Sequence, residues 1–311
     1  MYQTPILLLL FNRLETTKQL FISLKEIKPK HLYIFADGPR YSIIEDKTKC
    51  EEVRNWVVSN ITWDCELKTL FQEKNLGCGK GPATGITWFF SQVEEGLILE
   101  DDTIPNVDFY EFAAILLEKY RDCNDIMAIN SLNFQEKKRG DGSYYFSMQN
   151  GSLCAWATWR RAWLLFDYNL DIYSESLVRK SIKWYGVKKR EYKWWLNIYI
   201  DFKANAYNDS AWDYQFIFSI WVAKAKSIIP NVNLATNIGF GSDATHTRDF
   251  DSVLANKPTS SILPIVHPSS SKICREADLY YHDFYYNKFV EQISLFKKIK
   301  RKIKSAFRKS F

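Results

Sequence analysis

The chain has 311 residues, of which 46% are hydrophobic and 16% aromatic, and its formal net charge at pH 7 is +6. Such a length and composition indicate a folded protein with a sizeable core and exclude an intrinsically disordered chain. The apolar run at residues 6–11 is too short to cross a bilayer, and charged residues follow it at once. We therefore expect neither a signal peptide nor a spanning helix, and a cytoplasmic protein.

The first hundred residues alternate apolar, strand-like runs with amphipathic segments that have helical spacing. The expected strands are residues 6–11, 32–36, 65–71 and 97–99, and the expected helices start near residue 16 or span 51–58 and 82–93. Strands that are apolar throughout are covered on both faces, as in parallel sheets between helices. We expect an α/β fold with a Rossmann-like, mostly parallel sheet flanked by helices.

Polar residues follow each apolar run, where ligands of such sheets collect. These residues are Asn12 and Arg13, Asp37, the turn at 75–80, and the acids at 100–102. They are all expected along one edge of the sheet.

The stretch 96–102 reads GLILEDD and ends in three consecutive acids. Carboxylates at such short separations repel one another and raise each other's pKa unless a positive charge lies among them. A hard divalent cation such as Mn2+ or Mg2+ is the simplest such charge, because it prefers oxygen ligands. The alternative is a solvated acidic turn that caps a helix beginning near Pro105.

Seven stretches together carry a family resemblance: LLFNR, ADGPR, NLGCGKG, LILEDD, WATWRRAW, WDYQF and GFGSDATH, in this order. Over residues 4–247 the chain resembles GT-A-fold glycosyltransferases, most of all the N-acetylglucosaminyltransferase I family and related bacterial sugar transferases. The resemblance implies a GT-A-like fold and a metal-dependent, inverting transfer of a sugar from a nucleotide-diphosphate donor, with UDP as the nucleotide.

The resemblance also implies roles for the three acids. Asp102 would bind the metal directly, while Glu100 and Asp101 would hold the ribose and the metal's waters. The cation would neutralise the diphosphate that leaves with the nucleotide. His246 matches a late histidine that the family brings back to the metal, although a lone loop histidine is more often simply solvated.

Four further residues match the family's donor contacts. Asn12 and Arg13 would contact the nucleotide, and the guanidinium suits phosphate; the alternative for Arg13 is a surface salt bridge. Asp37 would accept a hydrogen bond from uracil, unless it only forms an Asp-Gly-Pro turn. Lys80, with the amides of the following helix, would face an anion, unless residues 75–81 are merely a structural turn.

The catalytic base matches Asp213, because an inverting transferase needs a carboxylate near the acceptor hydroxyl. The alternative is that Asp213 caps the helix predicted over 214–225. Trp156 and Trp212 would contact the acceptor, since an aromatic face suits the apolar face of a sugar. Buried core tryptophans are the competing interpretation.

The chain divides by expected role into residues 1–130, which bind the nucleotide-sugar, residues 131–283, which bind the acceptor and carry the base, and a tail at 284–311. Eight basic residues of the tail alternate with apolar residues at helical spacing. This predicts an amphipathic helix on an anionic membrane surface, and a docking helix or a disordered arm is the alternative. No nucleic acid partner is expected, because the net positive charge comes from these eight residues of the tail and not from a basic stripe on the folded body.

The function expected from these features is sugar transfer to a glycan or lipid-linked glycan acceptor, in bacterial surface polysaccharide synthesis at the inner face of the cell membrane. A sugar-1-phosphate nucleotidyltransferase is one alternative, but that class needs a glycine-rich basic loop near the N-terminus, and none follows Phe11. A non-catalytic, membrane-associated carbohydrate-binding protein is the other, and it has no need of three acids at a strand end.

Overall fold

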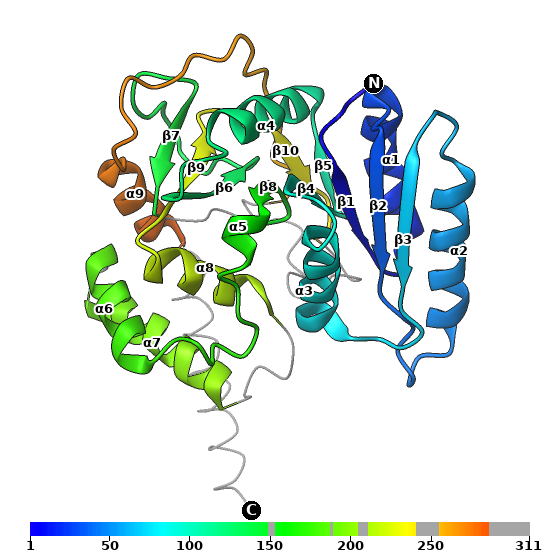
Figure 1. Ribbon diagram of the computed structural model, residues 1–311, viewed down its shortest axis with the longest axis horizontal. Helices are drawn as coiled ribbons and strands as arrows, with labels where there is room; N and C mark the ends of the chain where they lie inside the picture. The colour runs from blue at the N-terminus through cyan, green and yellow to red at the C-terminus, as the bar shows by residue number, and fades with distance from the viewer. Residues whose placement is uncertain (149–152, 187–188, 205–210, 241–254, 286–311) are drawn as a thin grey trace, which may run out of the picture.

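A central eight-stranded sheet organises the computed structural model, which describes residues 1–148, 153–186, 189–204, 211–240 and 255–285 (Figure 1). In the order β3-β2-β1-β4-β8-β6-β9-β7, the strands are β3 (Glu66–Phe71), β2 (His31–Ala36), β1 (Ile6–Leu10), β4 (Glu95–Glu100), β8 (Ala155–Trp159), β6 (Ile126–Asn130), β9 (Lys226–Pro230) and β7 (Tyr144–Ser147). Only β7 and β8 run against the other strands of this sheet. The expected mostly parallel α/β sheet is confirmed.

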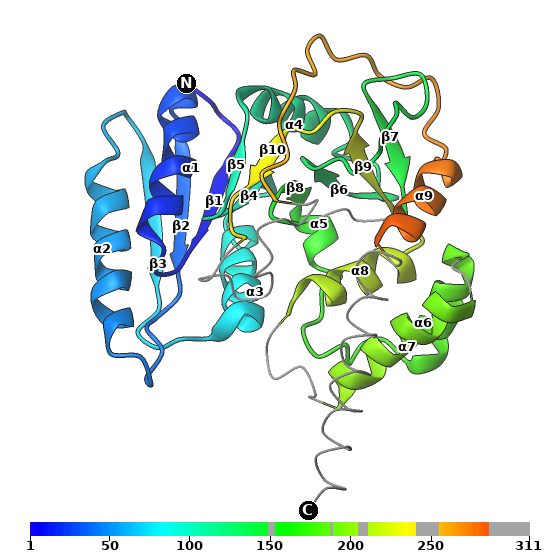
Figure 2. The same ribbon diagram turned by 180° about the vertical axis from the view of Figure 1, so that it is seen from behind.

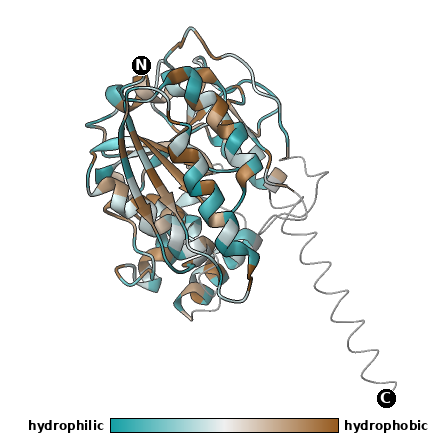
Figure 3. Ribbon diagram, turned by 90° about the vertical axis from the view of Figure 1, so that its right-hand side faces the viewer, coloured by the Kyte–Doolittle hydropathy of each residue, from teal (hydrophilic) through white to brown (hydrophobic). Residues whose placement is uncertain are grey.

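Helices cover both faces of the sheet (Figures 1 and 2). They are α1 (Leu14–Ile27), α2 (Glu45–Ser59), α3 (Gly77–Phe90), α4 (Val107–Lys119), α5 (Arg160–Trp163), α6 (Glu175–Tyr185), α7 (Lys189–Lys203), α8 (Asp213–Val222) and α9 (Arg275–Tyr285). Alternate residues of a strand point to opposite faces, so Leu8 packs in the core with α1, α2 and α4, and Leu7 packs with α3 and α5 to α8. Figure 3 accordingly shows hydrophobic strands between helices that carry hydrophilic residues.

Two differences from the expected elements concern the site. Helix α3 begins at Gly77, five residues before the predicted start at Pro82, so the glycine-rich stretch is itself helical. A second, two-stranded sheet pairs β5 (Thr103–Pro105) with β10 (Ala235–Asn237). This pairing brings the stretch that follows residue 235 against the end of β4.

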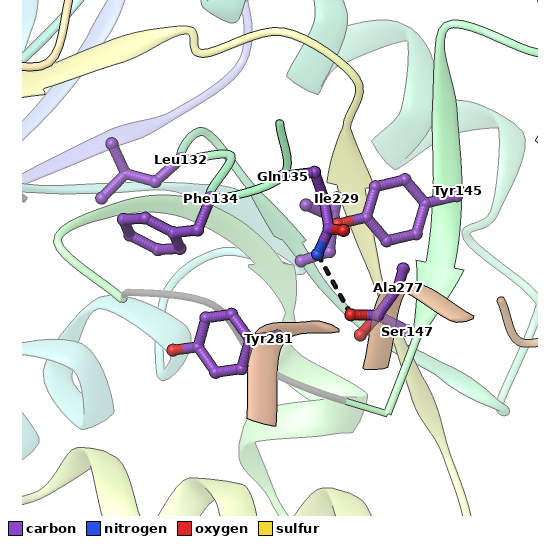
Figure 4. Close-up of a pocket in the computed structure, with 8 residues that line it drawn as sticks. All are labelled: Leu132, Phe134, Gln135, Tyr145, Ser147, Ile229, Ala277 and Tyr281. Carbon is purple, nitrogen blue, oxygen red and sulfur yellow. Dashed lines mark hydrogen bonds between the residues drawn. The ribbon is translucent and has the colours of Figure 1, made fainter. Parts of the chain in front are cut away.

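The last described helix, α9, is fixed to the sheet by buried polar contacts. The amide of Gln135 donates to the carbonyl of Ala277 over 3.1 Å, and the Ser147 hydroxyl donates to Asp278 over 2.6 Å. Figure 4 shows the cavity of about 10 Å3 between these residues. A space of that size holds at most one water molecule, so this cavity binds no larger ligand.

The predicted division at residue 130 does not interrupt the sheet, since β4 pairs with β8 from the second half of the chain. The roles of the two halves stay predictions. Within the described residues, no helix is both long and apolar enough to cross a bilayer. The predicted tail, apart from its first two residues, lies outside the described residues.

Candidate active site

The three acids lie where β4 ends and the chain turns into β5. The Asp101 amide donates to the carbonyl of Leu9 over 3.2 Å, which ties the turn to β1. On the other side, the Ile238 amide donates to the Asp102 carbonyl over 2.8 Å. Backbone contacts from both ends of the chain therefore fix this acidic corner, which we define as Glu100, Asp101 and Asp102.

Arg13 supplies the positive charge that the described residues place at this corner. Its guanidinium hydrogen-bonds both carboxylate oxygens of Asp101, and its Nη1 lies 2.9 Å from Oδ2 of Asp102. Burial alone would lower the pKa of Arg13, but the two acids raise it above its usual value. Arg13 thus makes an ion pair, as the alternative interpretation has it, with a partner that is buried: the Arg13 side chain is 26% exposed and that of Asp101 is 4% exposed. Its contact with a donor stays a prediction.

Glu100 is the acid that this arrangement leaves least compensated. Burial raises its pKa well above the usual value, and the charges of Asp102, Asp101 and Asp213 raise it further, while Arg13 lowers it. Asp213, from the start of α8, therefore lies close enough to act electrostatically on the acidic corner. Arg13 pairs with Asp101 and Asp102, so within the described residues the three acids of this corner outnumber the guanidinium paired with them.

The donor set fits a hard divalent cation. Carboxylate oxygens are the ligands that Mg2+ and Mn2+ prefer. Burial raises the pKa of Glu100 and the charges of the neighbouring acids raise it further, so a cation at this corner would stabilise its ionised form. The described residues contain no group of three His, Cys, Asp or Glu side chains able to hold a metal. Mg2+ needs no such cage, because one or two carboxylates, waters and substrate phosphates complete its shell. Asp102 and Glu100 would hold it; His246 lies outside the described residues.

Asp37 has a structural task. Its carboxylate accepts hydrogen bonds from the amides of Gly38, Leu76 and Gly77, over 2.8, 2.8 and 3.1 Å, and from the side chain of Asn75 over 3.0 Å. Burial raises its pKa and these backbone donors lower it. The first amides of α3 therefore face Asp37. Since a carboxylate offers about four acceptor positions, a uracil contact there would have to displace one of these donors.

Asn12 is tied to a residue that the sequence did not single out. Its side-chain amide donates a hydrogen bond to Oδ1 of Asp46 over 2.8 Å. The same oxygen accepts a hydrogen bond from Nη2 of Arg40 over 2.9 Å. Hydrogen bonds from Arg40 lower the pKa of Asp46. The Arg40 guanidinium also lies 5.3 Å from the centre of the Phe11 ring, and its side chain is 45% exposed. Arg40 thus presents a second cation near the end of β1.

Asp213 is the first residue of α8, and the N-cap position belongs to Trp212, which makes no side-chain cap. The alternative in which Asp213 is the capping residue is therefore wrong. An acid in the first helical turn is favoured by the helix dipole.

The two tryptophans assigned to the acceptor are core residues. Trp156 is fully buried and Trp212 is 5% exposed, and their rings stack 5.9 Å apart. Neither ring presents an open face, so the competing interpretation of buried core tryptophans describes both. The physical reason is that α8 packs on the sheet over β8 and covers Trp156.

Gly239 is a residue that sequence reasoning missed. A β-carbon there would lie 2.0 Å from Oδ2 of Asp102, so only glycine fits beside that carboxylate. Its amide donates to the Asn237 side chain over 2.8 Å. The signal in the sequence was a glycine in the GFG stretch, within a polar segment, but its partner could not be read from the sequence.

Comparison with known proteins gives distant likenesses. No protein-family model matches the chain, and no curated protein matches it. A mannosyltransferase from Pyrobaculum calidifontis, in complex with GDP-Man and Mn2+, is similar at 14% identity and a TM-score of 0.38, over 72% of this chain and 70% of that one. TarS from S. aureus is similar at 14% identity and a TM-score of 0.36, over 55% of this chain and 51% of that one. HddC from Yersinia pseudotuberculosis, complexed with GMP-PN, is similar at 12% identity and a TM-score of 0.30, over 52% of this chain and 78% of that one.

The chain thus spans about half of TarS and larger shares of the other two proteins. With TM-scores of 0.30 to 0.38, these likenesses carry no conclusion about what this chain binds or does.

Proposed function

We propose that this chain is a glycosyltransferase that moves a sugar from a nucleoside-diphosphate donor to a glycan or lipid-linked glycan, with the help of Mn2+ or Mg2+. The observation that carries the proposal is the acidic corner at the end of β4, where Arg13 pairs with Asp101 and Asp102. Burial raises the pKa of Glu100 there, and the charge of Asp213, which is far away in the sequence, raises it further. This arrangement supports a shared site for a base and a cation. A carbohydrate-binding protein without catalysis has no use for such a concentration of negative charge.

The chemistry follows from the charges at the corner. A cation held by Asp102 and Glu100 would supply the positive charge that stabilises a departing diphosphate. Arg13 would add a guanidinium suited to phosphate oxygens. Asp213 would accept the proton of the acceptor hydroxyl as that oxygen attacks the anomeric carbon. A single displacement of this kind inverts the anomeric centre.

We propose UDP as the nucleotide on the family resemblance alone. The Asp37 carboxylate, which would contact uracil, already accepts hydrogen bonds from four donors and adds no support for this choice. A nucleotidyltransferase is the weaker candidate. The connection from β1 to α1 consists of residues 11–13, which leaves no room for a glycine-rich triphosphate loop.

A donor-hydrolysis screen across UDP-, GDP- and CMP-sugars, with and without Mn2+, tests the proposal. Hydrolysis of one donor is expected in Mn2+ and not in EDTA. Asp213→Asn is expected to lower turnover by about 10^2 to 10^4 while keeping Mn2+-dependent nucleotide binding in calorimetry. Asp102→Asn is expected to lose that binding.

The proposal fails if Asp102→Asn binds nucleotide as the wild type does, or if no donor is bound or cleaved in Mn2+. Release of pyrophosphate from a nucleoside triphosphate and a sugar-1-phosphate would instead identify a nucleotidyltransferase.

A further inference from the structure

The outer face of α3 forms one wall of an open groove of about 440 Å3. Glycines on the inner face of this helix let it approach the sheet closely, since a β-carbon at Gly85 would lie 2.7 Å from the Phe35 ring. The outer face carries Lys80, Ala83, Thr84, Thr87, Trp88 and Ser91, at intervals of three and four residues. Phe166 and Tyr168, from the segment after α5, form the opposite wall.

The groove begins beside the candidate active site. Lys80 lies in the first turn of α3. The Gly77 amide in the same turn donates to the Asp37 carboxylate over 3.1 Å, so this turn adjoins one of the acids of the candidate site. On the opposite wall, the side chain of Gln215 in α8 donates to the carbonyl of Tyr168 over 3.2 Å. Both walls are thus attached to the candidate site: the start of α3 to Asp37, and Tyr168 to α8, which carries the proposed base Asp213.

The walls are held by contacts that do not fill the groove. The Trp163 indole donates to the Thr87 hydroxyl over 3.0 Å, which joins α5 to α3. The Trp163 ring stacks on Phe166 at 4.2 Å with an interplanar angle of 11°. Trp88 packs edge-on against Tyr33 at 5.6 Å. The groove is therefore a formed surface with aromatic rings in fixed positions.

The lining indicates one kind of occupant. Half-buried aromatic rings of Trp88 and Tyr168 offer flat apolar surfaces, while the hydroxyls of Thr84 and Ser91 offer hydrogen bonds. The Lys80 ammonium lies 5.9 Å from the centre of the Tyr168 ring and places a positive charge at the end nearest the acids. Sugar residues match this combination, because each ring has an apolar face and a rim of hydroxyls. The volume is within the range of small-molecule sites.

We infer that this groove binds a glycan: the part of an oligosaccharide acceptor that extends away from its reacting end. The inference rests on the proposed function for which end of the oligosaccharide lies at the active site. Glycan binding itself can be tested without catalysis. Lys80, predicted above to contact the donor, then lies where donor site and groove meet. The rings of Trp88 and Tyr168 then take the place of Trp156 and Trp212 as the aromatic surfaces for the acceptor, since the latter two rings are covered.

The experiment measures binding of the whole chain to a printed array of neutral and acidic oligosaccharides, followed by calorimetry with the glycan that gives the strongest signal. Thr84→Arg fills the groove without removing a core contact, and Tyr168→Ala removes one stacking surface. Each is expected to weaken glycan binding by about tenfold or more, which corresponds to about 1.4 kcal/mol. Tyr41→Ala, which removes a fully exposed aromatic ring outside the groove, is expected to bind as the wild type does.

Equal glycan binding by Thr84→Arg and the wild type would overturn the inference, and so would the absence of binding to every glycan on the array. Circular dichroism melting of each variant distinguishes a lost site from a lost fold, and a variant that melts with the wild type while losing the glycan supports the groove. Wild-type titration with UDP and Mn2+ is scored separately: its failure beside intact glycan binding would remove the proposed transferase and leave the groove standing.

Discussion

Nη1 of Arg13 lies 2.9 Å from Oδ2 of Asp102, the carboxylate proposed to hold a cation. The same guanidinium also pairs with Asp101, so one positive charge is shared between two adjacent acids. A cation that binds Asp102 must share this oxygen with Arg13 or use the other one. Arg13 would therefore influence the binding of a cation at Asp102 as well as the binding of the donor.

Replacing Arg13 by alanine is expected to destabilise the fold by about 3 kcal/mol in EDTA near pH 7.5, because it leaves the buried Asp101 charge without its partner. Burial raises the pKa of Asp101 and Arg13 lowers it, so the loss of Arg13 raises that pKa further and the folded variant takes up a proton more readily. The deficit should shrink as the pH falls towards the usual aspartate pKa of about 3.9. Urea denaturation across this range measures it.

Two variants serve as controls for this prediction. Arg13→Lys keeps the charge but not the forked geometry, and it should recover part of the loss. Lys18→Ala removes an exposed ion pair with Glu15 and should cost less than about 1 kcal/mol. A pH-independent deficit in Arg13→Ala would mean that packing, and not charge, is what Arg13 contributes.

Gly239→Ala is expected to move the Asp102 carboxylate, since the new β-carbon would meet its Oδ2 at 2.0 Å. Mn2+-dependent UDP binding in calorimetry should weaken by about 10- to 100-fold, the range for residues that orient a ligand of a metal. Gly140→Ala is the matched control: its β-carbon meets nothing within 4 Å, but its φ of +66° strains an alanine. It should lower the melting temperature and leave binding intact. Wild-type UDP affinity in Gly239→Ala would show that the position of the Asp102 carboxylate does not determine Mn2+-dependent binding.

Glu100→Gln is expected to stabilise the metal-free protein. The pKa of Glu100 is raised in the folded state, so the fold binds more protons than the unfolded chain, and wild-type stability falls as the pH rises above the usual glutamate pKa of about 4.3. Glutamine has no charge to bury. In EDTA the variant should melt above the wild type at neutral pH, by about 2–4 °C for each kcal/mol of relieved repulsion.

This advantage should vanish near pH 4 and reverse when Mn2+ stabilises the wild type alone. Glu118→Gln, at an exposed position of α4, should show no pH-dependent difference. If Glu100→Gln melts below the wild type in EDTA at every pH, the carboxylate is compensated by a group other than those that surround it here.

The edge of the sheet could be predicted from the sequence because apolar runs locate strands and parallel strands end together. Asn12, Asp37 and the acidic corner all follow strands as expected. Their partners could not be predicted. Asp46 reaches Asn12 from the first turn of α2, and two of the amides that donate to Asp37, those of Leu76 and Gly77, lie at the start of α3. Such side-chain contacts depend on how the helices are placed over the sheet, and no local pattern encodes that placement.

The tryptophans illustrate the same limit. Small residues beside Trp156 suggested an accessible floor, but the sequence does not say which layer covers a strand. Helix α8 supplies that layer, with Trp212 and Phe216 against Trp156. Trp88 shows the reverse case. It lies in a helix rich in apolar residues, where a buried ring would be expected, but it lines the groove.

The position of β8 between β4 and β6 has a consequence for synthesis on the ribosome. One edge of β4 can pair with β1 once β4 has been made, but its other edge pairs with β8, at residues 155–159. Strand β6 lies between β8 and β9, which both follow it in the chain. Until these strands are made, the nascent chain presents unpaired backbone on an apolar strand, the kind of edge at which chains aggregate. We therefore expect slow translation between β4 and β8 to lengthen the exposure of that edge.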